Sequence, residues 1–260
     1  MPTRLRRSGA LLAVPAAVLL ASCGPGQASP AAQTSASSAT STTPSSTPTT
    51  SSAAPTSAAP PAAAAPKRSK ASLEKALLGI DDLPAGFSVE PADQSGEGGP
   101  AVSSKDPRCK TLVTIMNADS APGATANAAT SFSGGQDGPW IDEQLAAMGG
   151  AERVSAFHAQ VRAAVKACSK LTLRLPQGTS TMAVRTVKAP TIGKDPVAFR
   201  ISAQGGPLDG FESTQVATGV GDVELMMSFL GAVPDDIDGG TQVAFDKAEQ
   251  TLGVKASSVS

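Results

Sequence analysis

The sequence of 260 residues contains no tyrosine, one histidine, one tryptophan and three cysteines. A single histidine excludes a metal site built from several imidazoles, and it leaves one candidate base for Ser-His-Asp or Cys-His catalysis. Eight aromatic residues without a tyrosine argue against a stacking platform for single-stranded nucleic acid. The scarce residue types therefore exclude several classes of function without indicating a ligand.

Charge is divided unevenly along the chain. The first 70 residues carry six basic side chains and no acidic one, whereas residues 71–260 carry 15 basic and 22 acidic side chains, a net charge of −7. An acidic body repels phosphate groups instead of releasing their counterions. We therefore expect no nucleic-acid partner.

The first 23 residues have the pattern of an export signal. Arg4, Arg6 and Arg7 precede an apolar stretch of 11 residues, from Leu11 to Ala21, which Pro15 interrupts. A membrane-spanning helix needs roughly 20 apolar residues, so this stretch is too short to be one and instead predicts a signal peptide.

The end of this segment, Leu20-Ala21-Ser22-Cys23, resembles the lipobox of bacterial lipoproteins. The resemblance implies that residues 1–22 are removed and that Cys23 receives a diacylglycerol thioether, with palmitate as the expected acyl group. Two acyl chains anchor a protein stably, whereas a single chain binds a membrane only marginally. We expect a protein lipid-anchored to the extracytoplasmic face of the cell membrane. The alternative is an ordinary secretory signal followed by an incidental cysteine.

Residues 23–70 predict a disordered tether. From Pro25 to Pro66 every residue is Ala, Ser, Thr, Pro, Gly or Gln, and eight of these 42 positions are proline. Without large apolar side chains the segment cannot offset its chain entropy by burial. A flexible coil of this length spans roughly 35–40 Å. Three basic residues that close the tether, Lys67, Arg68 and Lys70, are expected to be solvated.

Residues 71–260 predict a single α+β domain, an antiparallel sheet with flanking helices. Hydrophobic periodicity and capping signals predict helices that begin near Ser72, at Asp106-Pro107, at Ala151 and at Asp238, the last ending at Gly253. Alternating apolar residues predict strands at 87–90, 124–132, 140–148, 182–184, 197–201, 211–219 and 223–227. A loop rich in Gly, Pro and Ser is expected to run up to Lys105.

With Cys23 lipidated, Cys109 and Cys168 remain as an even pair in an oxidising compartment. We predict a disulfide that joins the helix over 106–116 to the end of the helix over 151–170, worth roughly 4 kcal/mol in the chain-entropy account. Two alternatives are a pair of buried free thiols and a two-cysteine metal site, for which His158 is the only other soft ligand.

The order of these features resembles a known family. A lipobox and a Ser/Thr/Pro/Ala tether precede a helix, the motif Leu83-Pro84-x-Gly86-Phe87, a cysteine helix and a long helix ending in Ala167-Cys168. This arrangement is similar to exported lipoproteins of actinobacteria whose domain resembles the extracellular sensor domain of the mycobacterial serine/threonine kinase PknH. The resemblance implies a cleft for an unidentified ligand and no catalytic residues. The kinase sensor has two disulfides, whereas this chain has one cysteine pair.

Three short motifs invite a catalytic or binding interpretation. Ser72-Leu73-Glu74-Lys75 fits the Ser-x-x-Lys element of penicillin-recognising enzymes, but the sequence has no Ser-x-Asn and no Lys-Thr-Gly element. The acidic run 235–239 lacks the residues that an EF-hand requires at its first and twelfth positions, so helix capping explains it better. Gly219-Val220-Gly221 lacks the third glycine of a dinucleotide loop and predicts a hairpin turn.

Two single residues are also candidates. His158 lies one position from the apolar stripe of the helix over 151–170, which predicts a boundary or surface histidine, with a pH-responsive role as the alternative. Trp140 is expected to be a partly buried anchor, with a gate over a cleft as the alternative.

These observations predict a lipid-anchored extracytoplasmic lipoprotein that binds or senses a ligand, without enzymatic activity, cofactor or metal. Its expected partners are the membrane, through the lipid, and an unidentified small ligand or cell-envelope component. One alternative is a structural or scaffolding cell-envelope lipoprotein, and another is an extracytoplasmic hydrolase, which needs a Ser/Asp/Lys constellation that the sequence does not show. A concave pocket with a few polar groups would favour binding, and a packed sheet without a cavity would favour scaffolding.

Overall fold

The computed structural model describes residues 67–91, 101–136, 138–176 and 178–254. All of these residues belong to one compact unit, Pro60–Ser260. The predicted signal peptide, the lipidation site Cys23 and most of the predicted tether lie outside the described residues.

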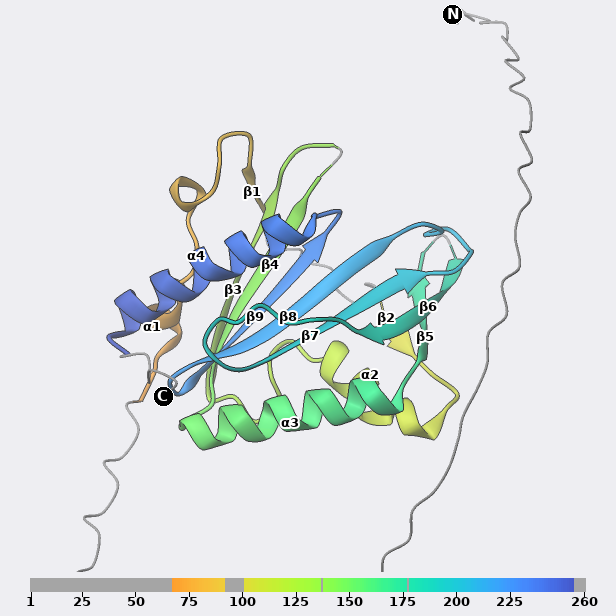
Figure 1. Ribbon diagram of the computed structural model, residues 1–260, viewed down its shortest axis with the longest axis horizontal. Helices are drawn as coiled ribbons and strands as arrows, with labels where there is room; N and C mark the ends of the chain where they lie inside the picture. Colours follow the sequence, from red (N-terminus) through yellow and green to blue (C-terminus); the bar gives the residue numbers. More distant parts are fainter. Residues whose placement is uncertain (1–66, 92–100, 137, 177, 255–260) are drawn as a thin grey trace, which may run out of the picture. The chain divides into compact units, whose positions relative to one another are not determined.

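The described part is built around one antiparallel sheet of nine strands (Figure 1). In spatial order the strands are β1 (Ser88–Glu90), β3 (Ala126–Ser133), β4 (Trp140–Ala147), β9 (Val223–Leu230), β8 (Glu212–Val220), β7 (Lys194–Ala203), β6 (Gly178–Thr186), β5 (Lys170–Leu175) and β2 (Ala101–Ser103). Every neighbouring pair is antiparallel. Short connections join most strands that are consecutive in the chain. For this reason the turn residues between them marked the ends of the predicted strands.

Helices cover both faces of the sheet. The described helices are α1 (Lys70–Glu74), η1 (Ile80–Asp82), η2 (Pro107–Cys109), α2 (Lys110–Met116), α3 (Ala151–Ala167) and α4 (Pro234–Leu252). α1 and α4 close one apolar core and α2 and α3 close a second one (Figure 1). Adjacent residues of β8 belong to different cores, because they lie on opposite faces of the sheet: Val216 is in the first core and Ala217 in the second. The predicted α+β class with flanking helices is confirmed.

Two helices begin earlier than predicted. α1 begins at Lys70, because Ser69 caps it and exchanges hydrogen bonds with Ser72, so Ser72 lies inside the helix. α4 begins at Pro234, and Asp238 lies within it, so the prediction that Asp238 starts the helix is wrong. The earlier start suits the sequence, because Pro234 occupies the first helical position and Asp235 and Asp236 lie in the first turn. The predicted end at Gly253, which has a left-handed conformation (φ 62°), is confirmed.

Two strands were not predicted. β2 lies inside the segment expected to be a loop and forms only by pairing with β5. β5 begins at Lys170, where the prediction still had helix, although Leu171, Leu173 and Leu175 alternate as a strand requires.

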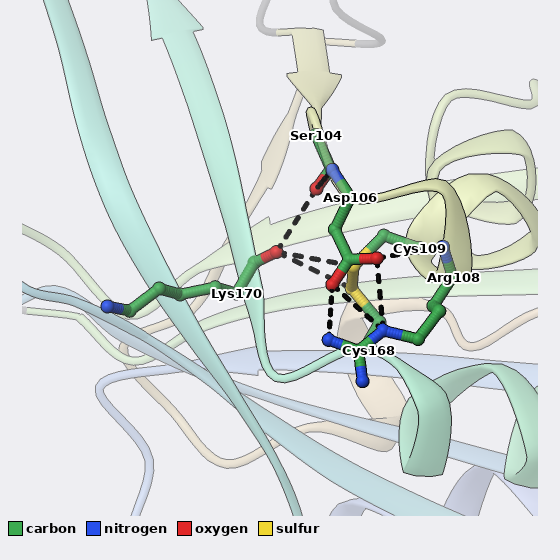
Figure 2. Close-up of a disulfide and its surroundings, with 6 residues drawn as sticks. All are labelled: Ser104, Asp106, Arg108, Cys109, Cys168 and Lys170. Atoms are coloured by element: carbon green, nitrogen blue, oxygen red, sulfur yellow. Dashed lines mark hydrogen bonds and ion pairs between the residues drawn. A yellow bond between two sulfur atoms is a disulfide. The ribbon is translucent and has the colours of Figure 1, made fainter.

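The predicted disulfide is present, with 4.7 Å between the Cα atoms of Cys109 and Cys168 (Figure 2). It ties the turn before α2 to the residue that ends α3. As predicted, Asp106 caps this turn, accepting a hydrogen bond from the backbone N–H of Arg108 at 3.0 Å and binding its guanidinium at 2.7 Å (Figure 2).

Arg68 fastens the start of the described chain to the domain. Its guanidinium pairs with the carboxylate of Asp222 at 2.9 Å and donates to the carbonyl oxygen of Leu252 at 2.8 Å. The Arg68 side chain is only 13% exposed, so the expectation that it is solvated is wrong.

Candidate functional site

The face of the sheet that carries α3 is only partly covered, and the uncovered part is a cleft of about 500 Å³. α3 lies over the end of the sheet where β8 turns into β9, with Val154 against Gly219. The cleft begins at Val161 on α3 and extends away from that end, with α2 and residues 118–121 as one wall. Ligand pockets commonly have volumes of 300–1,000 Å³, so the cleft is large enough for a small molecule.

A row of polar side chains crosses the floor of the cleft. Ser131 on β3 lies opposite Asp142 on β4, Asp142 opposite Ser228 on β9, and Ser228 opposite Gln215 on β8. Residues opposite each other on antiparallel strands share a face and lie about 5 Å apart. We call these four residues the polar row. Gln215 in turn lies opposite Phe199, where the floor becomes apolar.

The rest of the lining is mostly apolar. The apolar side chains come from five strands, from α2 and α3 and from the loop before β8: Val102, Ile115, Met116, Val161, Leu173, Met182, Phe199, Ile201, Phe211 and Met226. The cleft therefore combines a polar side, over β3, β4, β9 and β8, with an apolar side, over β7, β6 and β5.

Behind the cleft His158 and Glu224 form a buried pair. His158 lies on α3 one turn before Val161, and Glu224 lies on β9 two residues before Met226, so both are next to residues that line the cleft. The two side chains are hydrogen-bonded through Nε2 and Oε2 and are at most 1% exposed. The prediction of a boundary or surface His158 is wrong, because its partner comes from a strand 66 positions away.

Burial raises the pKa of the Glu224 carboxyl to about 7, and the hydrogen bond with His158 opposes this rise. Among the described residues, Oε1 of Glu224 and Nδ1 of His158 have no hydrogen-bond partner. The pair thus forms a polar contact between α3 and the sheet in otherwise apolar surroundings.

Glu143 is a second buried carboxyl, on the opposite face of the sheet. It accepts a hydrogen bond from the backbone N–H of Leu78 at 2.7 Å, and it is 1% exposed. Burial raises its pKa to about 8, and the Leu78 N–H and the nearby Lys247 oppose this rise. Because neighbouring strand residues face opposite ways, its side chain lies away from the cleft, and it reaches the lining through its backbone.

A second hollow of about 680 Å³ lies beside the first half of α4. Its lining is apolar except for Asp82, Asp235 and Asp236. Lys247 binds Asp82 and holds the pKa of that carboxyl below its usual range, and the other two stand in the first turn of α4, where the helix dipole favours them. These carboxylates have structural partners, so the cleft with its polar row is the stronger candidate site.

The motifs weighed in the sequence have structural roles. The hydroxyl of Ser72 accepts a hydrogen bond from the backbone N–H of Ser69, the N-cap of α1, and residues 235–239 are helical in α4. Gly221-Asp222 makes the two-residue turn of the β8–β9 hairpin, as predicted. Trp140 is partly buried, as expected.

Sequence reasoning missed the cleft floor. A signal was present in the sequence, because polar residues recur at every second position on one face of β4, β8 and β9: Asp142, Gln144, Ser213, Gln215 and Ser228. Recognising it requires knowing that these three strands are neighbours, which chain order does not reveal for β4 and β9.

No helix in the described part of the chain is long and apolar enough to cross a membrane.

No protein-family model matches the chain, and no curated protein matches its sequence. The fold is similar to that of a solved structure, the crystal structure of the extracellular domain of PknH from Mycobacterium tuberculosis. The TM-score is 0.51 and the sequence identity is 14%, over 72% of this chain and 97% of the other. The described domain therefore has the fold of this kinase sensor domain, as the sequence features predicted.

Proposed function

We propose that this protein is an extracytoplasmic binding or sensing module that holds a small ligand in the cleft. The observation that carries the proposal is the cleft itself, a concave surface of about 500 Å³ that joins a polar row to an apolar wall. An open sheet face of this kind leaves apolar side chains next to water, which costs stability. Such exposed apolar surfaces commonly mark binding sites.

The cleft is better suited to binding than to catalysis. Among the residues that the structure describes, Asp142 is the only one whose charged side chain belongs to the lining. Hydrolysis by acid–base or nucleophilic chemistry needs at least two cooperating groups, such as a paired base and nucleophile or two carboxylates. A single carboxylate among Ser and Gln side chains can orient a ligand by hydrogen bonds.

The proposed location is the outer face of the membrane, with a diacylglycerol on Cys23 as the anchor. The export signal and the lipobox support it, and the structurally similar PknH domain is described as extracellular. The tether would then hold the cleft domain roughly 35–40 Å from the lipid.

Small molecules that co-purify with the full-length protein test the binding proposal. Ser131→Trp places a large side chain in the cleft, and Val89→Trp places the same side chain on the edge strand β1, where Val89 is 56% exposed. Mass spectrometry of solvent extracts should find a molecule in the wild type and in Val89→Trp that is absent from Ser131→Trp. Identical extracts from all three proteins, or an empty extract from the wild type, would instead favour a scaffolding role.

Fractionation of cells tests the anchor separately. The Cys23→Ser variant should move from the membrane fraction to the medium, and the mass of the wild type should include a diacylglycerol group. Unchanged membrane association of the variant would contradict lipidation at this residue, and it would leave the binding proposal untouched.

A further inference from the structure

The hydrogen bonds within the polar row leave mainly acceptors for a ligand. The amide nitrogen of Gln215 donates to the hydroxyls of Ser213 at 2.9 Å and Ser228 at 2.8 Å, which uses both of its N–H groups. The carbonyl oxygen of Gln215 has no partner among the described residues, and neither has the carboxylate of Asp142. A ligand that satisfies the row must therefore bring donors.

Charge narrows the class of ligand further. None of the side chains that line the cleft is Lys, Arg or His, and residues 71–260 carry a net charge of −7. A phosphate, sulfate or carboxylate in the cleft would lose its hydration next to Asp142 without meeting a cation. An anionic head group is excluded on these grounds.

Two kinds of head group bring donors without a negative charge: an ammonium group and a group with several hydroxyls. The serine hydroxyls of the polar row favour the second. Ser131 and Ser228 flank Asp142 on both sides at spacings of about 5 Å. The hydroxyl of Ser131 has no partner among the described residues and can both donate and accept. That of Ser228 accepts from Gln215 and bonds the hydroxyl of Ser213 at 3.3 Å, which leaves it one site for a ligand. An ammonium group would use the carboxylate alone, and an exposed ion pair is worth little. A head group with several hydroxyls can engage the carboxylate, the amide oxygen and both serines together.

The apolar side of the cleft requires a matching part of the ligand. Phe199 continues the row directly, and Met182, Ile201 and Phe211 extend the apolar surface beyond it. A purely polar molecule would leave this surface uncovered, whereas an alkyl chain attached to the head group would bury it.

From these observations we infer that the cleft binds an uncharged amphiphile with a hydroxyl-rich head group on the polar row and an apolar chain along Phe199 and its neighbours. This inference rests on the proposed function, since it names the class of ligand for the same cleft.

Three probes with the same eight-carbon chain test it: octyl glucoside, octyl sulfate and octyltrimethylammonium, each below its micellar concentration. The protein is the full-length chain carrying Cys23→Ser, which removes the lipid. Trp140, the only tryptophan, lies on β4 on the same face as Asp142 and two residues from it, so its fluorescence reports on the row. Octyl glucoside should bind, and the two charged probes should bind at least about tenfold more weakly.

A matched pair of variants locates the bound head group. Asp142→Asn, at an exposed position, should weaken octyl glucoside about threefold, because the amide keeps one acceptor oxygen where the carboxylate has two. Asp238→Asn, at an exposed position of α4, should leave its affinity unchanged.

Three outcomes would overturn the inference. They are no binding of octyl glucoside, equal weakening by both variants, and preferential binding of octyl sulfate or octyltrimethylammonium. If the preferred charged probe were lost in Ser131→Trp, the cleft would remain the ligand site and only the class of ligand would be wrong. The comparison of solvent extracts from the wild type, Ser131→Trp and Val89→Trp tests whether the cleft binds any small molecule, whatever its head group. It therefore tests the proposed function separately from this inference.

Discussion

Replacing Glu143 with glutamine should change how the stability of the protein depends on pH. In the folded protein burial raises the pKa of this carboxyl from 4.5 to about 8, whereas the unfolded chain exposes it to water. Between these two values the folded state holds a proton that the unfolded state has released. The carboxyl therefore destabilises the folded state progressively as the pH rises from 4.5 towards 8.

The size of the effect follows from the two pKa values. Each pH unit in this range costs about 1.4 kcal/mol, so the free energy of unfolding falls by about 3 kcal/mol between pH 4.5 and pH 7, and by about 5 kcal/mol above pH 8. Glutamine has the same shape and can accept the hydrogen bond from Leu78, but it does not ionise. Relative to the wild type, Glu143→Gln should gain these amounts as the pH rises.

Denaturant unfolding at a series of pH values from 4.5 to 8.5 measures the effect. The informative quantity is the difference in unfolding free energy between variant and wild type, because contributions from Glu224 and other groups cancel in it. The new amide N–H₂ group can add a constant to this difference, but it does not change how the difference varies with pH. As a control, Glu90→Gln changes an exposed glutamate of β1, and its difference from the wild type should stay flat. A flat difference for Glu143→Gln as well would refute the argument from burial.

Two further predictions concern stability at one pH. Gly240→Ala should destabilise the protein, because its Cβ would lie 2.9 Å from the ring of Phe229, whereas Gly239→Ala, with no atom within 4 Å of the new Cβ, should stabilise α4 by about 1 kcal/mol. Thermal unfolding of both variants compares them directly, and equal shifts would contradict this packing. The double variant Cys109→Ser/Cys168→Ser should have an unfolding free energy lower by about 4 kcal/mol, because the disulfide closes a loop of 59 residues. An unchanged midpoint of denaturant unfolding would contradict this prediction.

The elements that sequence predicted well have strong local patterns. The apolar stripe of α3 comes from burial against the sheet, and in β6, β7 and β9 the apolar residues recur at every second position, so the periodicity of each segment is enough to reveal them. The disulfide followed from cysteine parity and the expected compartment.

What sequence missed depends on partners that lie far away in the chain. β2 has three residues and exists because β5 offers it an edge. The close contact of Gly240 with the ring of Phe229, which leaves no room for a Cβ, joins α4 to β9 and cannot be read from the helix alone. Similarly, His158 is buried because Glu224 provides a polar partner beneath α3.

The contact of Arg68 with Leu252 brings the two ends of the described domain to one place, at the β8–β9 turn that contains Asp222. A chain can therefore enter and leave the domain at a single point, which is the geometry that tolerates insertion into another protein and circular permutation. Gln215 and Ser228 lie five residues along their strands from the ends of this hairpin, or about 16 Å, so the polar row is separated from the point where the chain enters and leaves. This arrangement makes the domain a transferable module, which a chain can carry at its end or hold as an insertion without altering the strands that form the cleft.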